Sequence, residues 1–217
     1  TMTTFFIVQP PDQARCGGTM KNVVIVVALL LAAACRTPSS VAPLTVPLKY
    51  KTMASPAEIP SLPSCAAVSR VDVEDIRDDK AIGKRYVQDR PGAVAPVTAS
   101  TDVAAWVKEG FETTLQKGGA PIGARGSVLH VRVELITTNE NVLHRAGYDG
   151  RIALALELLP AGGGPACWSE RAEGSSENYG YAGSIENYQE TLNHALDRAA
   201  MRALSSPGFR KAVCSCG

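Results

Sequence analysis

Two stretches in the C-terminal half of the chain place a large apolar residue at every second position: 129, 131, 133 and 135 in the stretch 128–138, and 152, 154, 156 and 158 in the stretch 151–159. Because successive side chains of a strand point to opposite faces of a sheet, each stretch predicts a strand with one buried and one solvated face. Shorter stretches at 68–76 and 167–173 predict two further strands, the second of them less regular. A chain with this pattern has to cover the apolar face of its sheet with a second layer.

Two amphipathic helices can supply that layer. Residues 101–117 carry an apolar side chain at every fourth position before a Gly-Gly pair, and residues 185–204 carry a longer stripe before a Pro-Gly pair. Residues 79–100 contain several Gly and Pro and predict a long loop with room for a short extended piece. The predicted fold is α+β, in the order β-α-β-β-β-α, with two helices packed on one face of a mixed, mostly antiparallel four-stranded sheet. We expect this domain to span residues 65–217.

An apolar run precedes the domain. Residues 23–34 contain no charge, follow Met20 and Lys21, and end in three alanines. The run is too short to span a bilayer, for which a helix needs about 20 residues. A charged start, a short apolar core and small residues at the end describe a secretory signal peptide. We therefore interpret residues 20–34 as a signal peptide and residues 1–19 as an upstream extension, with a genuine extension starting at Met2 as the alternative.

The residue after this run is Cys35, and Leu-Ala-Ala-Ala-Cys resembles the lipobox of bacterial lipoproteins, whose cysteine is acylated and becomes the new N-terminus. It departs from that pattern at Ala32, where a branched residue is usual. The same residues also suit the cleavage site of a plain secreted protein, or an internal apolar helix. A lipidated Cys35 implies a membrane anchor. Arg36, in place of the aspartate that retains lipoproteins at the inner membrane, predicts the periplasmic face of the outer membrane.

The segment after Cys35 is rich in proline, with serine and threonine between the prolines. Such a composition favours extended chain, so residues 35–64 are predicted to form a tether behind the lipidated cysteine. The alternative is that part of 41–52 docks on a sheet edge. That docking would use the apolar residues Val41, Leu44, Val46, Leu48 and Tyr50.

Charge and motifs exclude several function classes. Removing residues 1–34 takes away two of 22 basic and one of 21 acidic residues, which leaves 20 of each. A nucleic-acid-binding protein normally shows a basic excess, so no nucleic-acid partner is expected. The sequence has no G-x-S-x-G elbow, and its glycine-rich 161–165 stretch lacks the Lys-Ser/Thr of a phosphate-binding loop. We expect no cofactor and no enzyme activity; an envelope hydrolase with an unrecognised active site is the alternative.

Residues that could bind a metal have simpler explanations. The three histidines, His130, His144 and His194, fall on predicted surface positions. A group of acidic residues could hold a cation, but a solvated strand edge and loop explain them better. These residues are Asp72, Glu74, Asp75, Asp78 and Asp79. We therefore expect no metal site.

The element order, the lipobox-like cysteine and two sequence segments resemble the YajG-type family of bacterial lipoproteins. The segments are DIRDDKAIGKR after the first predicted strand and ENYQETLNHALDRAAMRAL in the last predicted helix. The resemblance covers about residues 65–210. It implies an uncharacterised envelope lipoprotein of α+β fold and transfers no functional residue except the acylated cysteine, Cys35. Fold alone does not specify an activity.

Topology places three loops at one end of the predicted sheet. The first two strands, joined by a helix, run parallel and the later strands alternate in direction, so the loops 77–100, 139–147 and 174–184 gather at the end away from the tether. These loops contain tyrosine and arginine, which anchor many interfaces. We predict a surface that binds an envelope protein or a second copy of the chain, made of Tyr86, His144, Arg145, Asn178, Tyr179 and Tyr181. The alternative is that Tyr179 and Tyr181 cap the core above the last helix.

Four cysteines remain once Cys16 and Cys35 are set aside, an even number that favours disulfides in an exported domain. The topology brings all four to the other end of the sheet, and a bond between the two C-terminal cysteines would close a strained ring. The prediction is that Cys65 and Cys167 each pair with one of Cys214 and Cys216, in an order that stays open. A zinc site made from the same four thiolates is the alternative, although its C-x-C spacing is unusual.

Overall fold

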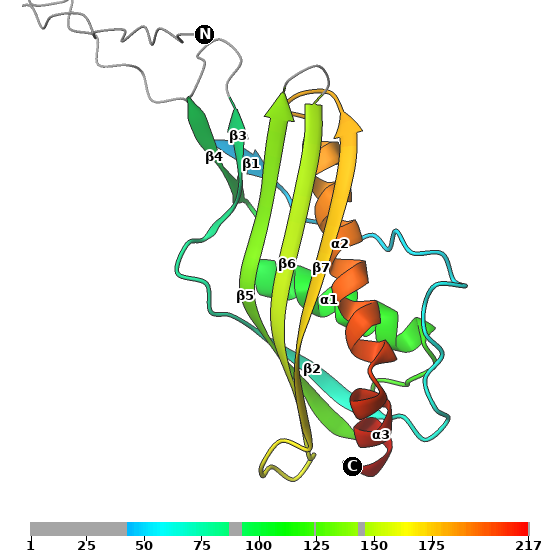
Figure 1. Cartoon of the computed structure of the whole chain (residues 1–217). Helices are drawn as coiled ribbons and strands as arrows, with labels where there is room; N and C mark the ends of the chain where they lie inside the picture. Colours follow the sequence, from blue (N-terminus) through cyan, green and yellow to red (C-terminus); the bar gives the residue numbers. More distant parts are fainter. Residues whose placement is uncertain (1–42, 87–92, 124, 143–145, 217) are drawn as a thin grey trace, which may run out of the picture. The chain divides into compact units, whose positions relative to one another are not determined.

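The sheet is built around one long strand, β5, which the other strands flank on both sides (Figure 1). The computed structural model describes residues 43–86, 93–123, 125–142 and 146–216; the predicted signal peptide, Cys35 and Val41 lie outside them. Within these ranges there are seven strands and three helices. The strands are β1 (Leu44–Val46), β2 (Val68–Asp75), β3 (Ala81–Tyr86), β4 (Val94–Ala99), β5 (Ser127–Val142), β6 (Ala146–Leu159) and β7 (Trp168–Gly180). The helices are α1 (Val103–Lys117), α2 (Ile185–Ser205) and α3 (Pro207–Ser215).

The strands follow the order β1-β4-β3-β5-β6-β7, and β2 also pairs with β5. β2 runs parallel to the first half of β5, and β3 runs parallel to its second half. The β1–β4 pair is also parallel, whereas β3–β4, β5–β6 and β6–β7 are antiparallel. β3, β5 and β7 therefore finish at the same end of the sheet. We call it the tyrosine end, after Tyr86, Tyr179 and Tyr181, and we call the opposite end, where β6 finishes, the disulfide end.

The α+β class is confirmed, but the expected four-stranded sheet is an undercount. The predicted loop 79–100 contains β3 and β4, and the proline-rich segment contains β1. β3 and β4 have six residues each, which is too short for a period of two to stand out between Gly and Pro residues. Half of the six neighbouring strand pairs are parallel; the antiparallel ones are the short β3–β4 pair and the long ladders of β5, β6 and β7.

A β-bulge in β5 changes which residues face the core. The register with β6 shifts between Val133 and Leu135, and an extra residue in one strand moves the following side chains to the other face. Leu135, predicted to point inward, is therefore exposed, while Ile136, Thr138 and Glu140 are buried.

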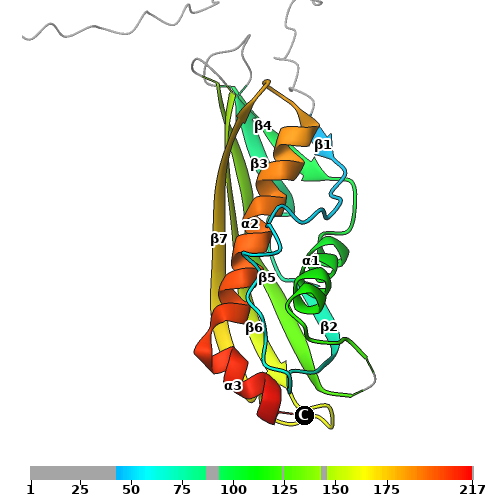
Figure 2. The same ribbon diagram turned by 90° about the vertical axis from the view of Figure 1, so that its right-hand side faces the viewer.

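Both long helices lie on one face of the sheet (Figure 2), as predicted. Asp102 caps α1 by accepting the N–H of Ala104 at 2.9 Å, and Ser184 caps α2 by accepting the N–H of Asn187 at 3.3 Å. Gly174 of β7 allows α2 to come close. The layer between helices and sheet is apolar and fully buried; its members include Val71, Phe111, Leu129, Leu154, Leu192 and Leu196. No helix among the described residues has the length and apolar character needed to cross a membrane.

Residues 43–64, which we call the strap, lie on this domain. β1 extends the sheet beside β4, and Val46 and Leu48 are buried. The hydroxyl of Thr101 accepts the N–H of Leu48 at 2.9 Å. The alternative in which part of 41–52 docks on a sheet edge is therefore confirmed from residue 43 onward. The apolar side chains of this stretch pack against the edge of the hydrophobic core. The strap runs from the tyrosine end to the disulfide end.

The face of α2 towards the strap carries three polar side chains spaced four residues apart. Gln189 donates to the carbonyl of Pro47, and Asn193 donates to the carbonyl of Lys49 at 3.2 Å. Asp197, one helical repeat further on, binds residues 50–54. Residues four apart lie on one side of a helix, so α2 holds the strap along its length through a single polar stripe.

Asp197 is only 2% exposed, yet it meets several donors. Its carboxylate accepts the Tyr50 hydroxyl at 2.5 Å and the N–H groups of Met53 and Ala54 at 2.6 and 2.9 Å. Burial and the hydrogen bond to Asp197 raise the pKa of Tyr50, so its hydroxyl remains a donor. Asp197 thus fixes the middle of the strap.

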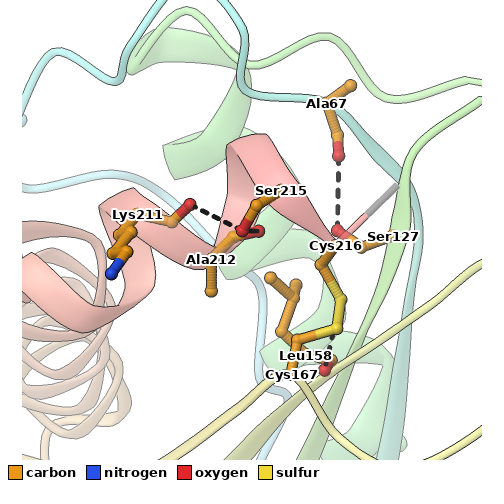
Figure 3. The surroundings of a disulfide bond; sticks show 8 residues. All are labelled: Ala67, Ser127, Leu158, Cys167, Lys211, Ala212, Ser215 and Cys216. Carbon is orange, nitrogen blue, oxygen red and sulfur yellow. Dashed lines mark hydrogen bonds between the residues drawn. A yellow bond between two sulfur atoms is a disulfide. The ribbon is translucent and has the colours of Figure 1, made fainter.

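Two disulfides close the other end of the molecule. Cys65 at the end of the strap bonds Cys214, and Cys167 before β7 bonds Cys216. Figure 3 shows the second bond, beside the carbonyl of Leu158. The structure thus selects one of the two pairings that the sequence left open. Each of the four sulfur atoms belongs to one of these two disulfides, which leaves no thiolate among them for the zinc site considered above.

Candidate functional site

The outer face of the sheet, opposite the helices, carries a row of aligned residues across five strands at the tyrosine end. Val94 pairs with Tyr86, and Gly147 pairs with both Asn141 and Tyr179. The β3–β5 register, in which Arg85 lies opposite Glu140, places Tyr86 beside Asn141. Directly opposed residues point to the same face, so Val94, Tyr86, Asn141 and Tyr179 all project outward.

The apolar side chains at this end are open to solvent. Tyr86 and Val94 are each 48% exposed, Tyr179 is 67% exposed and Tyr181 is 87% exposed. The Tyr179 ring lies beside Gly147, where an added Cβ would be 3.5 Å from the nearest ring carbon. Four of the six large exposed apolar residues in the described part of the chain are found here. We call Tyr86, Val94, Tyr179 and Tyr181 the tyrosine surface.

The alternative that Tyr179 and Tyr181 cap the core is wrong for their side chains, since both are mainly exposed. Asn178, also predicted to bind a partner, supports the strand end instead. Its side chain accepts the N–H of Tyr179 at 2.8 Å and donates to Glu190 at 3.1 Å. His144 and Arg145 lie outside the described residues.

A buried carboxylate supports this surface from inside the molecule. Glu140 is fully buried and accepts the N–H of Gly183 at 2.6 Å and the Tyr188 hydroxyl at 2.9 Å. The guanidinium of Arg85 lies 3.5 Å from the same carboxylate. Burial, together with the nearby Glu140 charge, raises the pKa of Tyr188, so its hydroxyl stays protonated and donates. The sequence pattern does not show Glu140 as a core residue, because the bulge in β5 precedes it.

Tyr148 fixes the loop that carries Tyr181. Its hydroxyl donates to the carbonyl of Tyr181 and accepts the N–H of Ser184 at 3.1 Å. Its ring packs edge-on against Tyr188, with centroids 4.9 Å apart. Burial also raises the pKa of Tyr148. The backbone beneath the tyrosine surface is thus held by buried hydrogen bonds, which lowers the entropy cost of binding.

Elsewhere, several of the polar residues singled out in the sequence have structural partners. Asp75 forms ion pairs with Arg77 at 2.8 Å and Lys80 at 3.6 Å. His130 lies 3.6 Å from Glu157. Within the described ranges, no three potential metal ligands converge. The tyrosine surface is therefore the strongest candidate site.

Comparison with known proteins gives a fold and no family. No family model matches the sequence, and no curated protein matches it. A Xanthomonas campestris protein of the DUF330 family is similar in structure, with a TM-score of 0.51, 10% identity, and coverage of 80% of this chain and 99% of that one. A Caulobacter crescentus protein titled "a putative lipoprotein" gives a TM-score of 0.35 at 15% identity, covering 50% of this chain and 78% of its own. The PelC dodecamer of Paraburkholderia phytofirmans gives a TM-score of 0.33 at 15% identity, covering 64% of this chain and 92% of its own. The first likeness shows that this chain shares the fold of the DUF330 protein.

Proposed function

We propose that the chain is an outer-membrane lipoprotein, held at the periplasmic face by acyl chains on Cys35, that binds a component of the envelope. The lipobox-like sequence and Arg36 support the anchor and its location. Two disulfides support export, because such bonds persist in oxidising compartments. In this proposal the protein is a binding or assembly module, with an envelope protein, a second copy or the membrane as its partner, and it performs no catalysis.

The observation that carries the binding role is the exposure of the tyrosine surface on a fixed support. Tyrosine offers a large contact area with few rotatable bonds, which suits it to anchor an interface. Tyr179 and Tyr181 are exposed, while the loop between them and α2 is held by Glu140 and Tyr148. A contact surface in this state needs little rearrangement before it binds.

In-cell photo-cross-linking tests the binding role. A photoreactive phenylalanine derivative at position 179 or 181 is expected to cross-link to an envelope component. The same group at Ala161, an exposed residue in the turn at the disulfide end, serves as the matched control. Equal labelling from positions 161 and 179 would contradict a specific surface.

A stability measurement separates binding from folding. Tyr179→Ala with Tyr181→Ala is expected to change the free energy of unfolding by about 0.5 kcal/mol or less, since both side chains are exposed. The double variant should nevertheless lose its cross-linked or co-purified partner. A loss of several kcal/mol would show that these residues serve the fold instead.

The anchor is tested at Cys35. Each buried CH₂ contributes about 0.8 kcal/mol, and two or more acyl chains give stable attachment. Cys35→Ser should therefore move the protein from the membrane to the soluble periplasmic fraction and abolish labelling by a fatty acid. Normal processing and membrane fractionation of Cys35→Ser would refute the lipid anchor.

A further inference from the structure

The chain enters the domain from the tyrosine end. β4 begins at that end with Val94, and β1 runs parallel to it, with Leu44 opposite Val97. At about 3.3 Å per residue, Leu44 therefore lies only about 10 Å along the sheet from the row that contains Val94. The loops at the tyrosine end were expected to lie away from the tether. This expectation is wrong, because the strap docks on the domain and begins near that same end.

The segment between Cys35 and Pro43, where the described part of the chain begins, is short compared with the domain. From Cys35 to Pro43 the chain can span at most about 28 Å, instead of the longer reach of a tether that continues to residue 64. β6 has 14 residues and is about 45 Å long. A lipid on Cys35 therefore allows the tyrosine end to reach the membrane, whereas the domain cannot stand upright on its disulfide end, because that end lies about 35 Å from Leu44.

The tyrosine end also has the chemistry of a membrane-facing surface. Tyrosine collects at membrane–water interfaces, where its ring lies among apolar groups and its hydroxyl stays hydrated. The neighbouring segments 94–99 and 178–184 contain no charged residue. On the outer face, the carboxylates of Asp149 and Glu177 lie two residues from the row along their strands, or about 7 Å further from this edge.

We propose that the tyrosine surface rests in the interfacial zone of the bilayer that holds Cys35, so that the partner of this surface is the lipid surface itself. The inference depends on the proposed lipid anchor. The domain then stands on the membrane with the tyrosine end inward and the disulfide end projecting away. A short tether brings the surface to the lipid at high local concentration, so weak contacts suffice.

Fluorescence quenching tests this orientation. The full-length, processed protein is reconstituted into vesicles of phosphatidylethanolamine and phosphatidylglycerol, with or without bromine on the acyl chains. Tyr179→Trp and Tyr86→Trp place reporters on the tyrosine surface, and Ala161→Trp places one at the disulfide end. The parent protein, which contains Trp106 and Trp168, gives the background signal. Brominated lipid should cause a loss of the added fluorescence at positions 179 and 86 and no loss at position 161.

The outcomes separate this inference from the proposed function. Mass spectrometry first shows whether Cys35 carries lipid; an unmodified cysteine would refute both the anchor and the inference. If the protein is lipidated but the reporters at 86 and 179 are no more quenched than the one at 161, the membrane contact is refuted and the anchor stands. Cross-links from position 179 to a protein, without quenching, would likewise reject lipid as the partner.

Discussion

Replacing Asp197 by alanine is expected to release the strap from α2. The change removes the acceptor of four hydrogen bonds: three short ones, from the Tyr50 hydroxyl and from the N–H groups of Met53 and Ala54, and a longer one from the Thr52 hydroxyl at 3.5 Å. It also leaves a cavity where the carboxylate was, because Asp197 is only 2% exposed. The folded state without Asp197 therefore keeps donors that have lost their partner.

The size of the effect follows from these contacts. A hydrogen bond to a charged group contributes about 1.5–3 kcal/mol net. Met53 and Ala54 are only half-buried, so water can replace part of what their N–H groups lose. We expect Asp197→Ala to cost about 3–5 kcal/mol. Tyr50→Phe, which removes one of the four donors, should cost about 1–2 kcal/mol.

Two measurements can be combined for this variant. Guanidinium unfolding gives the change in stability, and trypsin reports on the strap itself, because Lys49 and Lys51 are exposed cleavage sites within it. Cleavage there should be fast in Asp197→Ala and slow in the parent protein. Arg202→Ala, at an exposed position on the same helix, is the control. If Asp197→Ala matched this control in both stability and trypsin resistance, the assignment of Asp197 as the clamp of the strap would be refuted.

Three further changes test other parts of the fold. Gly174→Ala should cost about 1–3 kcal/mol, because its Cβ would lie 1.9 Å from the carbonyl oxygen of Ala195 and push α2 away; an unchanged denaturation midpoint would contradict this. Because the pKa of Tyr188 is raised on folding, its contribution is fully present below the unfolded value of about 10 and is lost as pH rises above it. Tyr188→Phe should therefore weaken the decline of stability measured above about pH 10. Removing the Cys167–Cys216 bond, which spans 49 residues, by a double change to serine should cost about 2–4 kcal/mol in guanidinium unfolding.

The long regular elements could be predicted because their patterns are local. Residues 185–204 keep one helical stripe and match α2 closely, whereas residues 151–159 keep one alternation and match only the second part of β6, which begins five residues earlier at Ala146. β5 could be followed only to Val133. The bulge that exposes Leu135 and buries Glu140 falls where Leu135 and Ile136 are adjacent and the alternation ends. The sequence alone does not show which of the two faces the core, because both strands of the pair are needed to see it.

The candidate site was predictable in part for a similar reason. Connectivity alone brings Tyr86, Tyr179 and Tyr181 to one end of the sheet, since β3 and β7 both finish there. Val94 was missed because β4 was not expected as a strand. Long-range pairing decides whether a short segment such as β4 is a strand, and no local signal replaces it.

The path of the strap determines how the domain would carry a mechanical load. A pull on the chain that precedes Pro43 acts along β1 towards the tyrosine end, parallel to β4, so it shears their hydrogen bonds together instead of unzipping them one at a time. The side chains of Gln189, Asn193 and Asp197 share the same load along α2. Beyond them the strap ends in the covalent bond between Cys65 and Cys214. If tension broke every non-covalent contact of the strap, this disulfide would still hold the chain and would transmit the force to the C-terminal helix α3.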